Sequence, residues 1–296
     1  MDLSPPAVGQ AVAEVFDGVD AVPRVERLDR GFSWVTLAVD DVIVRVAPQG
    51  GSLDPYDPEV EAANLRRVEG VVPAPAVLAV QPDADNPIGR PFGVHTRMPG
   101  GVLRLDDVTE QRSKYIAAAA QALGKLHDLT APMTVAEAFD AELSHTEAVY
   151  RRAAPNRHPE FEAALDWLRS HRPDCDDPAV WCHGDFRFAN LSWIGPGELG
   201  GILDWERAWP GDPMCDVAFT RRFSGWCSIE DSTDYGRPLD QERLEYAARF
   251  ERVRSFTASM RAIRAWLDGR SHDPRLLTIG RRGEEAMQTE LAWAAD

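Results

Sequence analysis

The chain changes character near residue 98, and this change limits the folds that it can adopt. Before that point, β-branched runs at 34–39 and 42–46 flank a two-residue acidic turn, the pattern of a β-hairpin. After it, apolar residues recur every three or four positions, the period of helices that face a core. The sequence therefore predicts an α+β protein with a smaller strand-rich part, residues 1–97, and a larger helical part, residues 98–296.

Within this outline the periodicity predicts individual elements. Helices are expected over 9–19, 59–68, 116–126, 161–168 and 242–267, and further strands over 93–98, 191–194 and 201–205. Residues 195–200 match the glycine pattern of a dinucleotide-binding loop, G-x-G-x-x-G. Such a loop must open a helix, but a strand is expected next, so the glycines predict a hairpin turn instead.

Net charge and cysteine content limit the classes of partner and site that the chain can have. The 32 Lys and Arg residues face 48 Asp and Glu, a formal net charge of -16, which disfavours nucleic acid and anionic membranes as partners. No run of about 18 apolar residues is present, and the first 20 residues lack a basic secretory n-region. The four cysteines form no CxxC pair, so we expect reduced thiols, no zinc site and a cytoplasmic protein.

Two short segments carry residues suited to phosphoryl transfer. The first, WCHGDFRFAN at 181–190, contains Asp185 and Asn190; the second, ILDWE at 202–206, contains Asp204. Phosphoryl transfer needs a carboxylate that holds and deprotonates the attacking hydroxyl, and oxygen ligands that hold Mg²⁺ against the nucleotide phosphates. Each residue alone is an ordinary turn residue, but the joint pattern favours a single metal and phosphate centre.

This pattern resembles the aminoglycoside phosphotransferase and choline kinase group of small-molecule kinases, which has a bilobal protein-kinase-like fold. Residues 161–218 are most similar to the kinase-like domains fused to some acyl-CoA dehydrogenases. The shared motifs are Trp-Leu at 167–168, Gly-Asp-Phe-Arg at 184–187, Asp-Trp-Glu at 204–206 and Gly-Asp-Pro at 211–213. The resemblance implies a small β-rich N-lobe, a larger helical C-lobe, Mg²⁺, ATP or GTP as phosphate donor, and a small-molecule hydroxyl acceptor.

Position by position, the resemblance makes Asp185 the catalytic base and makes Asn190 and Asp204 the metal ligands. Arg187 lies two residues after Asp185, where a cation would offset charge on the transferred group. The alternative for Arg187 is a surface ion pair.

Three further residues are expected to support this loop. His183 should brace it by hydrogen bonding rather than move protons. Asp212 and Asp216 resemble structural carboxylates that lie behind it.

The N-lobe of the related kinases binds the nucleotide. Residues 28–34, with Gly31 and Ser33, fall where the family's phosphate loop lies. This half of the chain has no lysine, so Arg45 is the natural substitute for the strand lysine that grips the phosphates, with Glu61 as its expected partner and Glu59 as the second choice. Arginine can bind phosphate bidentately, although it is not interchangeable with lysine. The alternative is a solvated Arg45 at a strand edge.

The hinge between the lobes is expected at residues 95–98. By resemblance, the carbonyl of Thr96 and the amide of Met98 would meet the purine edge.

The acceptor stays open between an amino sugar or another antibiotic and a hydroxyacyl-CoA. Carboxylates suited to an amino sugar are Glu206, Glu230, Asp231 and Asp234. Arginines that could form a basic path for coenzyme A phosphates are Arg221, Arg222, Arg252, Arg254, Arg261, Arg264, Arg270, Arg281 and Arg282. A third reading, favoured by the missing lysine, is a nucleotide-binding module of the pseudokinase type. The intact set of Asp185, Asn190 and Asp204 counts against that reading.

Overall fold

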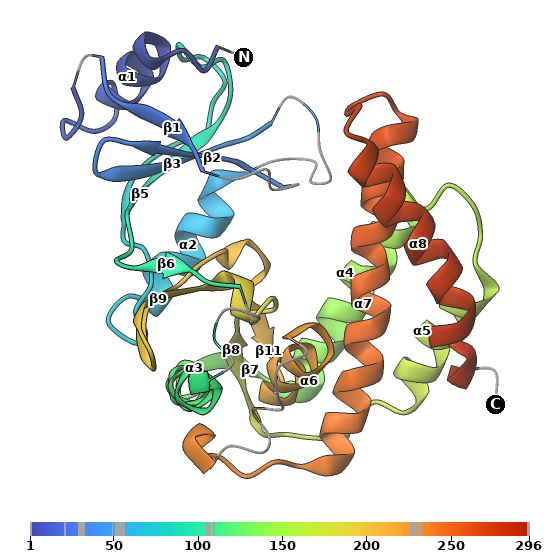
Figure 1. Ribbon diagram of the computed structural model, residues 1–296. Coiled ribbons are helices and arrows are strands. Elements are labelled where there is room, and N and C mark those ends of the chain that lie inside the picture. Colours follow the sequence, from blue (N-terminus) through green and yellow to red (C-terminus); the bar gives the residue numbers. More distant parts are fainter. Residues whose placement is uncertain are drawn as a thin grey trace.

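The computed structural model describes residues 2–20, 22–28, 33–48, 50, 57–104, 108, 110–224, 229 and 233–294. Two lobes of unequal size make up the molecule, an upper one around a sheet and a lower one that is mainly helical (Figure 1). This arrangement confirms the predicted fold class. The division between residues 97 and 98 stays a prediction.

The N-lobe is built on a five-stranded antiparallel sheet in the order β1-β2-β3-β5-β4. The strands are β1 (Val25–Arg27), β2 (Val35–Val39), β3 (Val42–Val46), β4 (Val77–Gln81) and β5 (Phe92–Thr96). The predicted hairpin is the β2–β3 pair, with Val39 opposite Val42 across the acidic turn. Alternating buried residues on β3 face the core, which leaves Arg45 on the other face of the strand.

Helix α1 (Pro5–Ala13) packs on this sheet through Val8 and Val12. The predicted range 9–19 was therefore wrong at both ends. Proline is favoured in the first turn of a helix, where its missing N–H has no partner to lose, and this explains the earlier start. Phe16 packs on the same core from the turn that follows, so the apolar spacing continues past the end of the helix.

Helix α2 (Pro58–Val68) begins at a strong start signal and confirms the predicted helix over 59–68. The Asp57 side chain accepts a hydrogen bond from the Glu59 N–H, and Pro58 occupies the first turn. Arg66 and Arg67 lie in the last turn, where positive charge stabilises the helix dipole. The helix contacts β4, β5 and the 3₁₀ turn η3 (Trp205–Arg207) of the C-lobe, so it links the two lobes.

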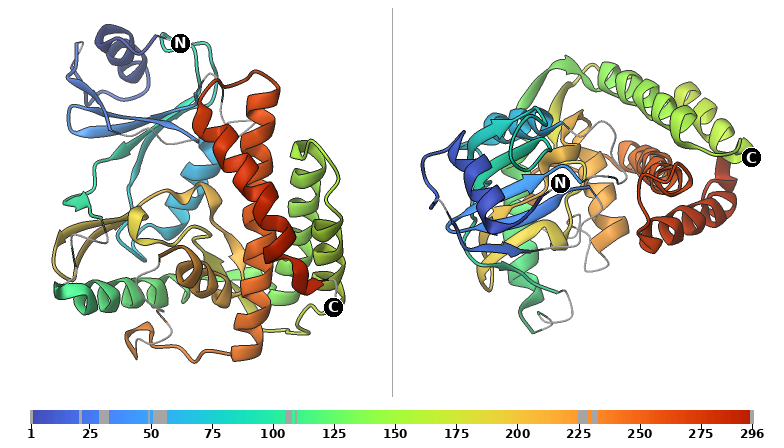
Figure 2. Two further views of the ribbon diagram at one scale, coloured as in Figure 1. Left: turned by 45° about the vertical axis from the view of Figure 1, so that its right-hand side comes forward. Right: turned by 90° about the horizontal axis from the view of Figure 1, so that it is seen from above.

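In the part of the chain that the structure describes, six α-helices form most of the C-lobe. They are α3 (Arg112–Leu126), α4 (Val135–Ala153), α5 (Pro159–Ser170), α6 (Pro213–Ser224), α7 (Gln241–Leu267) and α8 (Pro274–Glu290). The predicted helices over 116–126, 161–168 and 242–267 are confirmed as parts of α3, α5 and α7. Helices α7 and α8 pack against each other along one side of the lobe, beside α4 and α5 (Figure 2).

The C-lobe also contains two small antiparallel sheets. One pairs β6 (Gly101–Val102), β9 (Leu191–Gly195) and β10 (Glu198–Ile202), and the other pairs β7 (Thr130–Thr134), β8 (Pro178–Cys182) and β11 (Trp209–Gly211). The glycine pattern at 195–200 forms the β9–β10 hairpin turn, as predicted, although β10 begins at Glu198 and ends at Ile202 instead of covering 201–205. Strands β8 and β10 lead into segments 181–190 and 202–206, respectively. The positions of the strand ends therefore determine where the two segments meet.

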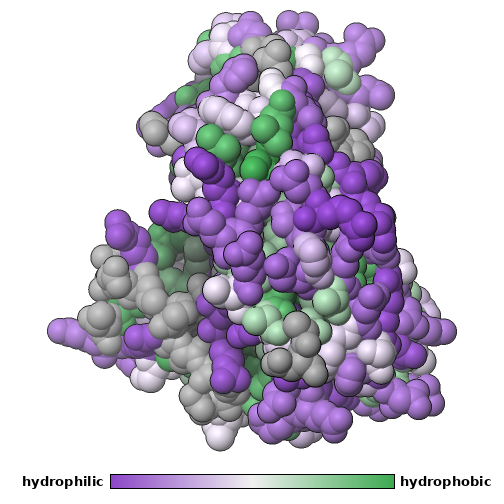
Figure 3. Space-filling model, turned by 90° about the vertical axis from the view of Figure 1, so that its right-hand side faces the viewer, coloured by the Kyte–Doolittle hydropathy of each residue, from purple (hydrophilic) through white to green (hydrophobic). Residues whose placement is uncertain are grey.

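Seen from the side of α5 and α8, the surface is mostly hydrophilic (Figure 3). Among the described residues, no helix combines the length and the apolar character needed to cross a bilayer.

Candidate active site

The loop after β8 carries Asp185 and Asn190 and holds them together. The Asn190 side chain donates from Nδ2 to the backbone carbonyl of Asp185 at 2.9 Å and to its Oδ2 at 3.0 Å. Both residues are buried, with exposed fractions of 8% and 7%. Because both bonds use Nδ2, the Oδ1 of Asn190 remains available as an oxygen ligand.

The loop after β10 brings Asp204 to the same place. The Leu203 N–H donates to the Asn190 carbonyl at 2.8 Å, which ties the two loops together one residue before Asp204. Asp204 has a left-handed backbone conformation, with φ 69°. Such a conformation in a residue other than glycine costs about 1–3 kcal/mol and persists only where neighbouring structure holds it, most often at functional sites.

Arg45 joins the N-lobe to this centre. Its Nη1 pairs with Glu61 of α2, and its Nη2 lies 2.7 Å from Asp204 Oδ1 and 3.5 Å from Glu206 Oε2. The Arg45 side chain is 15% exposed and its Cζ lies 5.6 Å from the centre of the Trp34 ring. The reading of a solvated Arg45 is therefore wrong, and Glu61 is its partner as predicted.

Three carboxylates around one guanidinium leave an excess of negative charge. Burial raises the pKa of Glu61 to about 7, although Arg45 opposes this shift. Burial, reinforced by the charge of Asp204, raises the pKa of Glu206 to about 8. Burial also favours a higher pKa for Asp204. However, the contact of Asp204 with Arg45 outweighs burial, so the pKa of Asp204 is lowered. Asp204 is thus the carboxylate of this cluster that stays ionised most readily.

The other predicted nucleotide residues lie in the N-lobe and at the hinge. Ser33 hydrogen-bonds the Glu206 side chain, and Gly31 lies outside the described residues. Thr96 ends β5 and pairs with Ala76, which donates from its N–H to Thr96 Oγ1 at 2.9 Å. Met98 follows two residues later, and its side chain packs on Gly201 of β10.

Glu59 and Arg187, two further residues of the predicted site, each lie beside a charged side chain. Glu59, the second choice as partner of Arg45, lies instead 3.4 Å from Arg66. Arg187 Nε lies 3.1 Å from Asp185 Oδ1, and 43% of the Arg187 side chain is exposed. The predicted cation is thus beside the predicted base, on the solvent side of the loop.

His183 braces the catalytic loop through both ring nitrogens. Its Nδ1 accepts from the Asp185 N–H at 3.2 Å, so Nε2 carries the proton and donates to the Leu203 carbonyl at 3.0 Å. Burial lowers the pKa of His183, which keeps the ring neutral. Behind the loop, Asp216 accepts the N–H groups of His183 and Gly184 at 2.7 and 2.8 Å.

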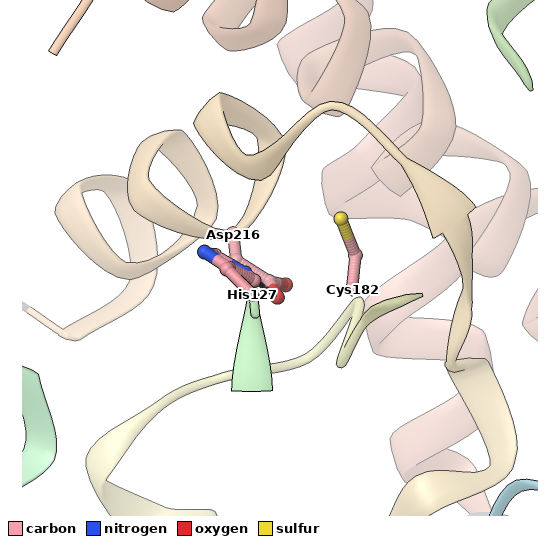
Figure 4. A group of neighbouring side chains, drawn as sticks. All are labelled: His127, Cys182 and Asp216. Carbon is pink, nitrogen blue, oxygen red and sulfur yellow. Dashed lines mark hydrogen bonds and ion pairs between the residues drawn. The ribbon is translucent and has the colours of Figure 1, made fainter. Parts of the chain in front are cut away.

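His127, Cys182 and Asp216 lie close enough together to resemble a metal site (Figure 4). However, each of them already has a hydrogen-bond partner. His127 uses Nδ1 for the Tyr235 hydroxyl at 2.7 Å and Nε2 for Asp216 at 3.1 Å. The Cys182 thiol donates to the Asp212 carbonyl, and burial raises its pKa well above the usual value, so it stays protonated. These three residues therefore form a buried network that supports the loop.

Sequence reasoning missed two contributors to this site. Glu206 was considered only as a contact for an amino sugar, yet it lies beside Arg45. Asn64 of α2 donates from Nδ2 to the Trp205 carbonyl at 2.9 Å and so links α2 to the segment after Asp204. An asparagine on the apolar face of the predicted helix was the signal that could have found it.

The residues proposed for the acceptor are less accessible than the sequence suggested. Arg254 is 6% exposed, Arg222 pairs with Glu290, and Arg264 donates to the carbonyls of Ala153 and Ala154. Arg254 therefore lines no surface path, and the guanidinium of Arg264 is already used by those two carbonyls. The other arginines of the predicted path stay a prediction. Of the acidic candidates, Asp234 accepts a hydrogen bond from Gln121, whereas Glu230 and Asp231 lie outside the described residues.

Comparisons with known proteins identify a matching family and shared folds. A family model described as the phosphotransferase enzyme family matches residues 24–266. Acyl-CoA dehydrogenase family member 10 of Mus musculus is 27% identical over 201 residues, which cover 63% of this chain and 19% of that protein. The chain thus spans about a fifth of this relative's length.

Solved structures share the fold. A putative aminoglycoside phosphotransferase from Ralstonia eutropha matches with a TM-score of 0.69 and 18% identity, over 98% of this chain and 97% of that one. The aminoglycoside phosphotransferase APH(4)-Ia, as a mutant in a ternary complex with AMP-PNP and hygromycin B, matches with a TM-score of 0.66 and 16% identity, over 96% and 98%. The bilobal kinase-like architecture is therefore common to all three chains.

Proposed function

Because the chain belongs to the phosphotransferase enzyme family, we propose that it is a small-molecule kinase that moves the γ-phosphate of ATP to a hydroxyl group with the help of Mg²⁺. The observation that supports this most is the convergence of Asp185, Asn190 and Asp204 with an arginine that comes from the other lobe. GTP is an alternative donor.

In the proposed reaction Asp185 is the base. The acceptor hydroxyl loses its proton to Asp185 as its oxygen bonds to the γ-phosphorus, and the bond from that phosphorus to the bridging oxygen breaks with its electrons left on ADP. Asn190 fixes the carboxylate through Oδ2, and the acceptor would approach the other oxygen, Oδ1, which lies 3.1 Å from Arg187 Nε. Arg187 is close enough to Asp185 to offset charge on the transferred group.

The residues fit a magnesium ion. Asn190 Oδ1 and the Asp204 carboxylate are hard oxygen ligands, and the cluster around Arg45 carries more negative charge than one arginine balances. When bound, Mg²⁺ would neutralise charge on the nucleotide phosphates. Arg45, held by Glu61, would bind these phosphates through its planar guanidinium. Ser33 would lie near the phosphates, and the backbone of Thr96 and Met98 would meet the purine.

Two acceptor classes remain, and each has one observation in its favour. The relative that is an acyl-CoA dehydrogenase favours a hydroxyacyl-CoA, whereas the structural neighbour that binds hygromycin B favours an amino sugar. A nucleotide-binding module without turnover is the remaining alternative, because arginine replaces the lysine of the family.

A substrate panel tests the proposal. Amino sugars, choline-like alcohols and hydroxyacyl-CoAs are each incubated with the protein, Mg²⁺ and γ-labelled ATP or GTP, and label transfer is measured. We expect transfer to one class, which requires Mg²⁺ and is absent in Asp185→Asn. Nucleotide binding without transfer to any acceptor would instead support the binding module.

A further inference from the structure

Arg254 reaches from the middle of α7 to the two loops that form the candidate active site. Its Nη1 lies 3.4 Å from the Gly184 carbonyl and its Nη2 lies 3.1 Å from the Arg207 carbonyl. Gly184 directly precedes Asp185, and Arg207 follows Asp204 by three residues. One planar guanidinium therefore contacts the backbone of both loops.

The two loops touch each other at this point. Gly184 has φ +74°, and a Cβ added there would lie 2.3 Å from the Arg207 carbonyl oxygen and 3.1 Å from Arg254 Nη1. Any side chain at position 184 would therefore separate the loops. The peptide between Gly184 and Asp185 is held at both ends, because its carbonyl faces Arg254 and its N–H donates to His183 Nδ1.

The Arg254 side chain is itself fixed from several directions. Its Nε donates to Glu142 Oε1 of α4 at 2.8 Å, and Nη1 lies 3.4 Å from Glu251 Oε1, one turn earlier on α7. Its Cζ lies 5.1 Å from the centre of the Trp209 ring on β11. Neighbouring carboxylates keep the pKa of Arg254 above its usual value despite burial, so the guanidinium stays charged. Contacts of this kind leave the side chain little freedom to move.

We propose that Arg254 is a positioning residue for phosphoryl transfer, which sets the separation between Asp185 and Asp204 by binding the carbonyls of Gly184 and Arg207. This inference rests on the proposed function. A base and a metal ligand on two loops act together only at the correct spacing, and a displacement of about 1 Å can cost about 100-fold in rate.

The first test compares Arg254→Lys with wild type. Lysine keeps the charge but cannot reach two carbonyls with a planar fork. We expect kcat to fall about 10- to 100-fold while KM for ATP stays close to wild type, and the thermal unfolding midpoint should fall because lysine makes fewer of these buried contacts. Arg264→Met is the matched control, because Arg264 lies on the same helix and also binds carbonyls, but those of Ala153 and Ala154 at the end of α4.

A second variant removes the guanidinium without leaving a fully buried charge. Glu251 is 1% exposed, so Arg254→Met is combined with Glu251→Gln. Hydrogen exchange of peptides that cover 183–190 and 203–208 is then measured in the protein without ligands. We expect faster exchange in both peptides and unchanged exchange in Arg264→Met.

The two readouts separate failure of the inference from failure of the proposed function. If wild type shows no turnover but the double variant exchanges faster, the kinase assignment is refuted. The inference that Arg254 holds the two loops would still stand. A folded Arg254→Lys variant with unchanged kcat, or unchanged exchange in both peptides, would overturn the role of Arg254.

Discussion

Arg45 donates from Nη2 to Oδ1 of Asp204 at 2.7 Å, so a cation on the N-lobe sheet contacts the carboxylate that the proposed function assigns to Mg²⁺. The two residues are 159 positions apart in the chain. Their contact joins the N-lobe sheet to the loop after β10. A cation or a phosphate that binds at Asp204 would therefore lie beside the Arg45 guanidinium.

Replacing Arg45 should affect stability and nucleotide binding to different degrees. Arg45→Met removes the partner of the buried Glu61, and breaking a buried ion pair costs about 3–5 kcal/mol. Arg45→Met combined with Glu61→Gln should recover part of that stability, because Glu61 then leaves no buried charge, whereas Asp204 and Glu206 still lose their cation. Nucleotide affinity should stay low in both variants, as measured by calorimetry. Recovery of affinity in the double variant would show that Arg45 does not bind phosphate.

Arg45→Lys addresses the missing lysine directly. A lysine restores the residue type of the related kinases but contacts fewer carboxylate oxygens, because it is a point charge rather than a fork. We expect measurable Mg-ATP binding in this variant, together with a lower unfolding midpoint. If Mg-ATP does not bind to the folded lysine variant, the arginine geometry is itself required.

Asp204→Asn should remove the metal dependence of nucleotide binding. The pKa of Asp204 is lowered by Arg45, so it provides a full negative charge at neutral pH, and the amide does not. We expect wild type to bind ATP more tightly with Mg²⁺ than with EDTA, and the variant to bind equally under both conditions. Asp166→Asn on the exposed side of α5 is the control. A metal effect of wild-type size in Asp204→Asn would place the ion elsewhere.

His95 makes one contribution to the pH dependence of stability. Burial, with the charges of Arg45 and Arg66, lowers the pKa of His95 to about 3, against about 6.5 in the unfolded chain. At this residue the unfolded state therefore binds more protons between pH 3 and 6.5, and the contribution of His95 to stability rises with pH across this window, by about 2 kcal/mol from pH 5 to pH 6.5. Glu61 and Glu206 contribute in the opposite direction, because their raised pKa values mean that the folded state binds more protons than the unfolded one.

Denaturant unfolding at several pH values measures this effect. His95→Gln should lower the slope of the free energy of unfolding against pH between pH 5 and 6.5, whatever its constant cost. His145→Gln, which removes an exposed histidine from α4, is the control. An unchanged slope in His95→Gln would mean that His95 is not the group that titrates.

The local parts of the site could be predicted from the sequence. Asp185 and Asn190 are five residues apart, and Asp204 follows a short hairpin, so their meeting depends on contacts that are close along the chain. The pair of Arg45 and Glu61 was also predictable, because a charged residue inside a β-branched strand needs a partner, and α2 offers two glutamates. The fold class followed from the change of periodicity near residue 98.

Contacts between distant elements were not predictable in this way. Arg254 is buried on α7, and its neighbours Gly184 and Arg207 are 70 and 47 positions away. Its sequence neighbourhood looks like a solvated helix surface, so it was grouped with a basic surface path. Likewise, nothing near Glu206 indicates that it faces β3, because that orientation depends on the left-handed turn at Asp204.

The central claim is that Asp185 accepts the proton of the attacking hydroxyl, and one comparison tests it most directly. Asp185→Asn keeps the size of the side chain but lacks the basic carboxylate, so it should bind Mg-ATP with nearly wild-type affinity. In single-turnover experiments with the acceptor found in the panel, we predict a loss of phosphate transfer of at least about 100-fold. A variant that transfers phosphate at the wild-type rate would contradict the account.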